Sequence, residues 1–369
     1  MKVLSVSFEN YRNLYDGGLQ ADETTNIICG PNAQGKTNLL EAMWIFTGGH
    51  SFRGAKDSEL IAFGKTTFEM NMKFFSEERE QDAKINMTNG RRSVTINDIP
   101  KKSASSLVGK FCAVVFSPQH LSLVKEGPSN RRNFIDGSLC QSKPAYAKLL
   151  MHYNRTLSQR NMLLKEITKH PELKDTLEIW DEKLVKFGVS IIKERFSYLE
   201  LLQPIVEEIY HGISSQREHF SLKYDSSFLK EGQTEIETCF FEKLKSSRKS
   251  DFMVGYTTVG PHRDDISFYI NEISARSFGS QGQQRSVALA LKLAESKVME
   301  SITGDKPVMF LDDVMSELDE NRQDYILNHL KDQQVFITCC DPNTIHQLKQ
   351  GALFKIHQGE LIEQMILKS

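Results

Sequence analysis

The sequence lacks the features that mark secreted, cross-linked or membrane-spanning proteins. Its six cysteines include no C-x-x-C pair and have no spacing typical of a zinc site or a disulfide framework. The first residues, MKVLSVSFENYR, contain no apolar stretch of the kind that a signal peptide requires, and no apolar run approaches the length that crosses a bilayer. We therefore expect a cytoplasmic protein with reduced thiols and no membrane partner.

Internal repeats and low-complexity tracts are also missing, and no heptad pattern is long enough for an extended coiled coil. What is present is an ordinary globular composition, with 39% hydrophobic, 25% charged and 9% aromatic residues, which excludes wholesale disorder. A chain of 369 residues exceeds what one hydrophobic core usually organises. We therefore expect two lobes.

Charge is distributed unevenly along the chain. The formal net charge is −2, yet residues 84–165 hold 14 Lys or Arg against three acidic residues, a local net of +11 that leaves −13 for the rest. Within this segment, Arg131 and Arg132 follow the turn signal Gly127-Pro128, and we expect that turn to direct them outward. The segment favours a nucleic acid or another polyanion as partner, with a solvated basic surface or salt bridges as the alternative.

The order of elements alternates between strand-like and helical patterns. Residues 1–28 predict strands that lead into a Gly-rich turn, with a helix from Thr37, and residues 66–116 predict a β-rich layer. Residues 146–209 predict two or three helices, interrupted at Gly188 and Pro204. Strand character returns over residues 252–273, after a linker-like stretch at 246–250.

The C-terminal part predicts an amphipathic helix over residues 281–299, followed by two buried strands at 307–311 and 335–338. Each short apolar run ends in polar or sulfur-containing residues. The first ends in Asp312-Asp313, and the second ends in Cys339-Cys340-Asp341. Parallel strands end in this way at the carboxyl edge of a sheet.

A phosphate-binding loop is the most specific motif. The segment after the strand at residues 25–28 matches G-x-x-x-x-G-K-T and precedes a helix-forming run. Its glycines allow backbone N–H groups to surround phosphates, its lysine supplies a cation, and its threonine is placed to hold Mg²⁺. The residues predicted to bind the nucleotide are Gly30, Pro31, Asn32, Ala33, Gln34, Gly35, Lys36, Thr37 and Asn38.

A phosphate-binding loop of this kind works with carboxylates elsewhere in the chain, one to bind magnesium and one to orient the attacking water. Asp312 is the candidate metal ligand beside Thr37, and Asp313 is the candidate residue that orients or deprotonates the attacking water, with Lys36 as its cationic partner in catalysis. The alternative is that both carboxylates cap the next turn. The separation of Lys36 from Asp312 excludes compact nucleotide kinases, because a large insertion must lie between them.

A second anion site is predicted at the start of the helix at 281–299. Ser280, Gly282 and Gln283 combine a hydroxyl, a glycine backbone and a helix N-terminus, and they precede the Asp312 strand. If this site faces the γ-phosphate bound by another subunit, two nucleotides are sandwiched between two chains. A simple serine N-cap is the alternative.

These motifs together resemble the heads of ABC-type ATPases, with the S-x-G-Q signature and a D-loop at Ser316-Glu-Leu-Asp319. More closely, the whole chain resembles the RecF family of bacterial recombination mediators. The matching stretches are FENYRN at 8–13, GPNAQGKTNLLEA at 30–42, VFSP at 115–118, GPSNRRNFID at 127–136, TTVGPHRDD at 257–265, SQGQQR at 280–285 and FLDDVMSELD at 310–319. Residues 140–250 carry no matching motif.

The resemblance implies an α/β fold, a P-loop ABC/SMC-type ATPase head with a largely helical second lobe inserted. Residues 1–122 and 302–369 are then the ATP-binding lobe, and residues 123–301 are the insertion. It also implies ATP and Mg²⁺ as cofactors, an ATP-dependent homodimer, and a weak, DNA-stimulated ATPase that acts as a switch. The implied setting is DNA repair, replication and recombination, including the SOS response to DNA damage.

Its implied partners are double-stranded and single-stranded DNA at gaps or junctions, together with RecO and RecR, which help to load RecA. Arg12 is implied to reach the nucleotide phosphates, with a surface salt bridge as the alternative, and Gln119 is either a Q-loop residue or a turn residue. Asp313 stands where most ABC heads have glutamate, which implies slow hydrolysis. No histidine directly follows the strand that ends at Thr338, because Cys339, Cys340 and Asp341 stand there, and His262-Arg-Asp-Asp265 has no spacing that suits a metal.

Three function classes are therefore compared. A P-loop kinase lacks the signature and the D-loop. An ABC-transporter ATPase subunit is the alternative to a DNA-binding switch ATPase, but it requires a membrane partner, and the basic segment is better suited to DNA. An SMC-like tether is disfavoured because no long coiled coil interrupts the chain.

Overall fold

The computed structural model describes residues 1–88, 90–167, 169–214, 216–229, 235–341 and 350–367. The chain divides into two compact units, one formed by Met1–Ser122 with Arg285–Ser369 and the other by Leu123–Gln284. The first division falls between residues 122 and 123, where the sequence placed it. The second falls between 284 and 285 rather than between 301 and 302.

The difference at the second boundary arises from helix α7 (Gln281–Thr303). Its first turn carries the signature, so the sequence analysis assigned the whole helix to the insertion. From Arg285 onward, however, its side chains interact within the first unit. Ser286 Oγ accepts a hydrogen bond from Arg322, and Ser296 Oγ contacts the side-chain amide of Gln333.

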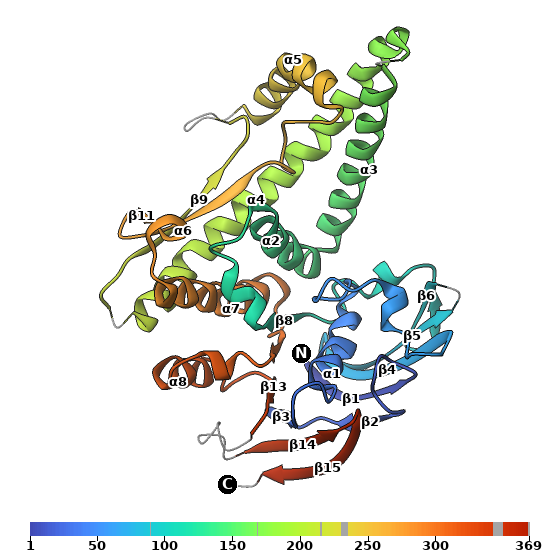
Figure 1. Cartoon of the computed structure of the whole chain (residues 1–369), viewed down its shortest axis with the longest axis vertical. Coiled ribbons are helices and arrows are strands. Elements are labelled where there is room, and N and C mark those ends of the chain that lie inside the picture. The colour runs from blue at the N-terminus through green and yellow to red at the C-terminus, as the bar shows by residue number, and fades with distance from the viewer. Residues whose placement is uncertain (89, 168, 215, 230–234, 342–349, 368–369) are drawn as a thin grey trace. The chain divides into compact units, whose positions relative to one another are not determined.

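The first unit contains a central sheet in the order β15-β14-β3-β13-β12-β8 (Figure 1). Strands β14, β3, β13, β12 and β8 run parallel, and β15 is antiparallel at one edge. Every residue of β8, β12 and β13 is buried, as expected for short apolar runs covered on both faces. The bounds are Thr25–Cys29 for β3, Ala113–Phe116 for β8, Val308–Leu311 for β12, Val335–Cys339 for β13, Gly351–His357 for β14 and Glu360–Leu367 for β15.

A second sheet of the first unit is antiparallel, in the order β2-β1-β4-β5-β6-β7. Buried and accessible residues alternate along β4 and β5, so one face of this sheet contributes to a core shared with α1 and the central sheet. Asn97 and Asp98 both have positive φ and join β6 to β7 in a two-residue turn. The bounds are Lys2–Glu9, Gly17–Gln20, Thr67–Ser76, Arg79–Thr88, Arg91–Ile96 and Ile99–Lys101 for β1, β2, β4, β5, β6 and β7.

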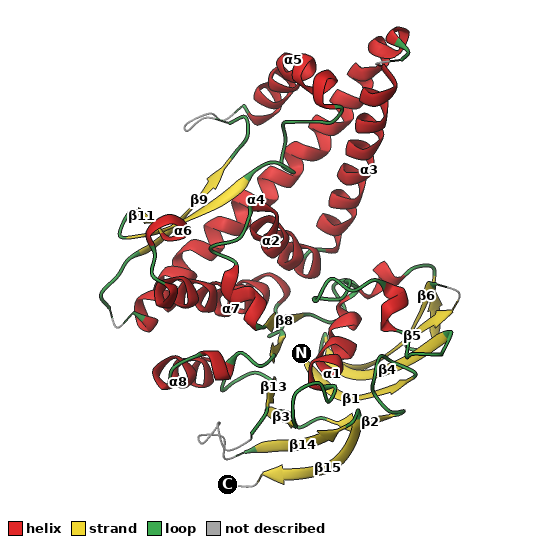
Figure 2. Cartoon of the chain, viewed as in Figure 1, coloured by secondary structure: helices red, strands yellow, loops and turns green. Residues whose placement is uncertain are grey.

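Helices of the first unit lie along the chain before, between and after these strands (Figure 2). The α-helices are α1 (Lys36–Trp44), α8 (Glu320–His329) and the part of α7 described above. The short 3₁₀ helices are η1 (Ile45–Thr47), η2 (Asp57–Leu60), η3 (Ala104–Leu107), η4 (Pro118–Ser122) and η6 (Met315–Glu317).

The second unit is largely helical, as expected for the insertion. It carries a small antiparallel sheet in the order β11-β10-β9. Its helices are α2 (Pro128–Ser142), α3 (Pro144–Ile167), η5 (Pro171–Thr176), α4 (Leu177–Ile213), α5 (Ile236–Val254) and α6 (Ala275–Phe278). Its strands are β9 (Phe220–Asp225), β10 (Asp265–Ile270) and β11 (Ile273–Ser274).

Two local expectations in this unit are wrong. Helix α4 continues through Gly188 and Pro204 over 37 residues, because tertiary packing outweighs the helix-breaking tendency of both. A side chain at position 188 would lie 2.5 Å from the ring of Phe240, so glycine is required for this packing rather than for a break. The supposed linker at 246–250 lies inside α5.

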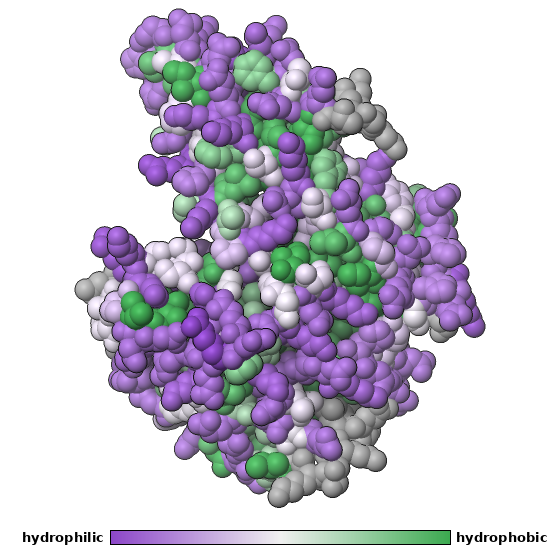
Figure 3. All heavy atoms as spheres, turned by 180° about the vertical axis from the view of Figure 1, so that it is seen from behind, coloured by the Kyte–Doolittle hydropathy of each residue, from purple (hydrophilic) through white to green (hydrophobic). Residues whose placement is uncertain are grey.

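The surface is mainly polar. The face in Figure 3 shows hydrophilic side chains interrupted by groups of apolar ones. In the part of the chain that the structure describes, no helix combines the length and the apolar character needed to cross a membrane.

Candidate nucleotide-binding site

The phosphate-binding loop connects β3, which ends at Cys29, to α1, which begins at Lys36. Both motif glycines are required by close packing. A Cβ at Gly30 would lie 2.3 Å from the carbonyl oxygen of Ile356, and Gly35 has φ of 108°, a conformation that L side chains rarely adopt. The loop therefore has a fixed, tightly packed path into the N-terminus of a helix.

Lys36 is a buried cation inside this loop. Its Nζ donates to the carbonyl oxygens of Gly30 at 2.8 Å and Pro31 at 3.1 Å. Only 4% of the residue is exposed, and none of the carboxylates in the described residues lies within ion-pair distance of it. A buried ammonium without a counter-ion at the N-terminus of a helix suits a bound anion, so the chemistry of this loop fits phosphate.

Thr37 and Asp312 meet at the carboxyl edge of the central sheet. Thr37 Oγ1 donates to Asp312 Oδ1 at 2.8 Å, and Thr338 Oγ1 contacts the same oxygen at 3.0 Å. Burial is the main reason that the pKa of Asp312 is raised, and the neighbouring carboxylate of Asp313 raises it further. Hydroxyl and carboxylate oxygens are the ligands that Mg²⁺ prefers, so this pair fits a magnesium ion.

Asp313 lies beside this pair in an uncommon backbone conformation. Its φ is 51°, in the left-handed region, and its backbone N–H donates to Thr338 Oγ1 at 2.8 Å. Its side chain is partly accessible, whereas that of Asp312 is buried. Strained backbone of this kind is concentrated at functional sites, and here it gives two consecutive carboxylates different surroundings.

Arg12 forms a salt bridge within the chain. Its Nε and Nη2 donate to the carboxylate of Glu41 at 2.6 Å and 2.9 Å, and Glu41 is fully buried on helix α1. The pair is therefore more buried than the surface salt bridge that was the alternative for Arg12. A role of Arg12 at the nucleotide stays a prediction, and the structure adds that Glu41 anchors this arginine beside the phosphate-binding helix.

Two residues of this region were not recognised as site residues from the sequence. Thr338 is the next-to-last residue of strand β13, which pairs with β12 and so places its hydroxyl beside both aspartates. Cys340 is exposed, and its sulfur lies 3.0 Å from Asn32 Oδ1 and 3.8 Å from Lys36 Nζ. The signal available was the rule that neighbouring parallel strands place the residues after their carboxyl ends together.

The signature residues lie in the second unit at the start of α7. Ser280 and Gln283 form a reciprocal pair: Ser280 N–H donates to Gln283 Oε1 at 2.8 Å, and Gln283 N–H donates to Ser280 Oγ at 3.2 Å. Gln283 Nε2 donates to Glu218 at 2.7 Å, so both polar groups of this amide are engaged within the chain. Gly282 lies in the first turn of the helix.

Gln119 lies in η4, directly after strand β8, with its side chain exposed and its carbonyl accepting from Ser122 Oγ. This position is compatible with a Q-loop residue and with a simple turn residue, the two roles expected for Gln119. Its function stays a prediction.

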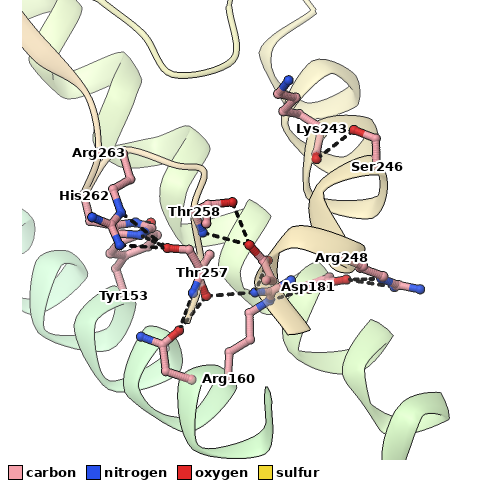
Figure 4. Close-up of polar contacts among 12 residues, drawn as sticks. Tyr153, Arg160, Asp181, Lys243, Ser246, Arg248, Thr257, Thr258, His262 and Arg263 are labelled. Atoms are coloured by element: carbon pink, nitrogen blue, oxygen red, sulfur yellow. Dashed lines mark hydrogen bonds and ion pairs between the residues drawn. The ribbon is translucent and has the colours of Figure 1, made fainter. Parts of the chain in front are cut away.

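The TTVGPHRDD stretch, residues 257–265, connects helices of the second unit (Figure 4). The buried Arg160 of α3 donates to Asp181 of α4 at 2.6 Å and to Asp251 of α5 at 2.8 Å. It also donates to Thr257 Oγ1 at 2.8 Å. One arginine therefore links three helices to the start of the stretch.

His262, in the same stretch, has both ring nitrogens within hydrogen-bond distance of groups inside the unit. Nδ1 lies 2.7 Å from the hydroxyl of Tyr153, and Nε2 lies 3.1 Å from the carbonyl oxygen of Thr257. Burial lowers its pKa to about 4. The stretch is therefore a structural connection in this molecule, and the described residues hold no group of three or more His, Cys, Asp or Glu arranged for a metal.

The basic segment at residues 84–165 is neutralised in part by the fold, because six of its 14 Lys and Arg side chains form salt bridges in the described residues. Its salt bridges run to acidic residues outside the segment, namely Lys84 to Glu69, Arg92 to Asp57, Lys110 to Glu77, Arg131 to Asp265, Lys143 to Glu194, and Arg160 to Asp181 and Asp251. A net charge counted along the sequence therefore overstates the positive field of the folded segment.

The outward placement of Arg131 is wrong, whereas Arg132 remains partly accessible. Pro128 begins helix α2 instead of holding a loop open, since proline suits the first turn of a helix. The Arg131 side chain is 2% exposed and pairs with Asp265 through two hydrogen bonds, of 2.7 Å and 2.9 Å. Arg132 donates to the carbonyl oxygen of Asp264.

The fold and the site together define a P-loop ATPase head of the ABC/SMC class. The family described as "RecF/RecN/SMC N terminal domain" matches residues 2–361. A crystal structure of an SMC head bound to the C-terminal winged-helix domain of ScpA shares the fold, with a TM-score of 0.59 at 14% identity, covering 100% of this chain and 98% of that one. The predicted fold class is confirmed.

Within that class, the chain belongs to the RecF family of DNA replication and repair proteins. It is 43% identical to RecF of Agathobacter rectalis over 98% of this chain and 99% of that protein. RecF of Ruminiclostridium cellulolyticum is 40% identical over 98% and 99% of the two chains.

A solved structure described as the recombination mediator RecF-ATP in the RecFOR pathway has a TM-score of 0.91 at 39% identity, covering 99% of this chain and 97% of that one. The family predicted from the motifs is confirmed.

Proposed function

We propose that this chain is an ATP-operated switch in DNA repair and recombination: ATP with Mg²⁺ brings two copies together on DNA, and slow hydrolysis releases them. The observation that carries the proposal is that the Lys36 ammonium, which has no carboxylate partner in the described residues, lies at the same edge of the sheet as the Thr37–Asp312 hydrogen bond. Support also comes from the solved relative whose name includes ATP.

In this proposal the residues divide the chemistry between them. Lys36 supplies positive charge to the terminal phosphates, and the backbone N–H groups of the loop bind them. Thr37 and Asp312 hold the magnesium ion, which neutralises phosphate charge when bound. Asp313 orients the attacking water, and its short side chain, where most ABC heads have glutamate, makes turnover slow.

In this proposal, the second copy of the chain contributes to the nucleotide site through its signature residues. Ser280 and Gly282 are placed at a helix N-terminus, which attracts an anion, and we propose that they contact the γ-phosphate bound by the other copy. Each nucleotide then lies between the phosphate-binding loop of one chain and the signature of its partner. ATP acts as the dimerising agent because its γ-phosphate is the group that both chains contact.

The partners follow from the family. DNA at gaps or at single-strand/double-strand junctions is the proposed substrate surface, and RecO and RecR are the proposed protein partners in loading RecA. Support comes from solved relatives described as acting in the RecFOR pathway. Repair in the bacterial cytoplasm is the corresponding location.

Analytical ultracentrifugation tests the switch directly. The protein is sedimented with ATP, with ADP and without nucleotide, each with and without a gapped duplex. We expect dimers with ATP, monomers with ADP, and co-sedimentation of DNA with the dimer. A monomer that persists at saturating ATP and DNA contradicts the proposal.

A further inference from the structure

Glu218 accepts a hydrogen bond from the signature glutamine, Gln283. It precedes strand β9, and its two carboxylate oxygens are engaged by two different helices. Oε1 accepts from Gln283 Nε2 of α7 at 2.7 Å, and Oε2 accepts from the hydroxyl of Tyr210, in the last turns of α4, at 2.6 Å. A single carboxylate therefore connects the signature helix to the end of a 37-residue helix.

This contact fixes which way the Gln283 amide faces. Its oxygen accepts the N–H of Ser280, so its nitrogen must face an acceptor, and Glu218 supplies that acceptor. If the nitrogen had no acceptor, the amide would be free to rotate and the N–H of Ser280 would lose its partner. The conformation of the first turn of α7 thus depends on Glu218.

The carboxylate itself is held in a fixed position. Tyr210 is fully buried and packs against Phe220 with ring centroids 5.5 Å apart. The neighbouring residue His219 exchanges hydrogen bonds with Asn271, both at 2.9 Å, which fixes the backbone beside Glu218. These contacts therefore hold the Glu218 carboxylate in the orientation in which it accepts from Gln283, the residue that pairs with Ser280.

We propose that Glu218 is a positioning residue for the signature: it orients Gln283, and through Gln283 it shapes the Ser280 turn that contacts the partner's nucleotide. The proposal rests on the proposed function, because it concerns the same composite site. Glu218 does not touch the nucleotide in this scheme. It acts on the dimerisation step and leaves ATP binding by one chain unchanged.

The central test compares Glu218→Ala with Glu218→Gln. The alanine variant has no acceptor for Gln283, whereas the glutamine variant keeps one. We expect Glu218→Ala to weaken the ATP-dependent dimer roughly tenfold, the loss expected for one hydrogen bond to a charged group, and Glu218→Gln to restore most of it. Glu208→Ala, at an exposed glutamate of α4, is the matched control and keeps wild-type dimerisation.

Two further readouts separate positioning from loss of structure. The affinity of the monomer for a fluorescent ATP analogue stays within twofold of wild type in Glu218→Ala, and its turnover recovers at high protein concentration because mass action restores the dimer. In a double-mutant cycle, Glu218→Ala adds little to Gln283→Ala, since both changes remove the same contact.

The outcomes distinguish this inference from the proposed function. If the wild-type chain does not dimerise with ATP, the proposed function fails. If the wild type dimerises and Glu218→Ala dimerises equally well, the positioning role is overturned while the function stands. If Glu218→Ala does not fold, Gln283→Ala decides: a weakened dimer supports the inference, and a normal dimer overturns it.

Discussion

Thr37 Oγ1 donates a hydrogen bond to Asp312 Oδ1 over 2.8 Å, although 275 residues separate the two along the chain. Both residues belong to the first unit, so the insertion leaves their pairing intact. A threonine hydroxyl and a carboxylate held this close already have the arrangement of two magnesium ligands. Substitutions around this pair therefore have distinct expected effects on binding and on turnover.

Lys36 and Asp313 should separate these two steps. Lys36→Ala removes the cation that faces the phosphates, and we expect ATP affinity to fall at least about tenfold. Asp313→Asn keeps the shape and loses the charge that orients water, so ATP still binds and phosphate release slows roughly 100-fold. Equilibrium binding and phosphate release measure the two effects, with Lys65→Ala, at an exposed lysine, as control. Undiminished turnover in Asp313→Asn removes this residue from the catalytic role.

Ser280→Arg should affect dimerisation alone. A long cationic side chain at this position blocks contact with a partner's phosphate, while the chain's own phosphate-binding loop is unchanged. We expect near-normal ATP affinity without an ATP-dependent dimer. In a mixture with Lys36→Ala, one composite site carries both defects and the other carries neither, so some ATPase activity returns. Normal dimerisation of Ser280→Arg rules out the composite site.

Arg131 should prove structural. It is buried and paired with Asp265, so Arg131→Ala leaves a carboxylate without its partner, and we expect a loss of about 3–5 kcal/mol in the free energy of unfolding. Chemical denaturation gives the value, and Arg155→Ala, at an exposed arginine of α3, is the control. A change in the salt dependence of DNA binding, with stability unaffected, would instead indicate a phosphate contact.

Cys340 offers a direct probe of the nucleotide site. Its sulfur is exposed and lies 3.8 Å from Lys36 Nζ, so a nucleotide bound at that lysine should shield it. We expect iodoacetamide to label Cys340 readily without nucleotide and at least about fivefold more slowly at saturating ATP. Peptide mass spectrometry identifies the labelled residue. In Lys36→Ala, ATP should no longer protect, and protection that persists there points to another cause.

His262 makes stability depend on pH. Burial lowers its pKa from 6.5 to about 4 in the folded state, while the unfolded chain keeps the ordinary value. The contribution is therefore fully present above pH 6.5 and is lost as the pH falls toward 4, by about 3 kcal/mol. Unfolding free energies at several pH values measure this slope. His262→Gln should flatten the profile between pH 6.5 and 4, and an unchanged profile assigns the acid sensitivity to other groups.

Much of the site could be predicted from the sequence because its parts are locally encoded. The loop from Gly30 to Thr37 has a fixed spacing, and Asp312 follows a short apolar run that is typical of a buried strand. Thr338 and Cys340 were missed because their roles depend on which strands are neighbours. That β13 lies between β3 and β12 is a property of the sheet, not of any segment.

Predictions based on charge and on helix breakers failed for a related reason. A window count of Lys and Arg cannot detect partners such as Asp265 and Asp251, which lie far along the chain. Likewise, Gly188 weakens an isolated helix, but its missing side chain makes room for Phe240 in the folded unit. The charged residues and the glycine were interpreted from their local sequence alone, whereas contacts with residues far along the chain determine their roles in the folded protein.

The central sheet has a consequence for synthesis of the protein on the ribosome. Strand β3, which leads into the phosphate-binding loop, has β13 (Val335–Cys339) and β14 (Gly351–His357) as its neighbours, and both are translated after residue 334. Translation at roughly 5–20 residues per second leaves the nascent loop without those neighbours for tens of seconds. The inserted helical unit is fully translated before β13 and β14 are made. We therefore expect this unit to fold first and the nucleotide-binding site to form last.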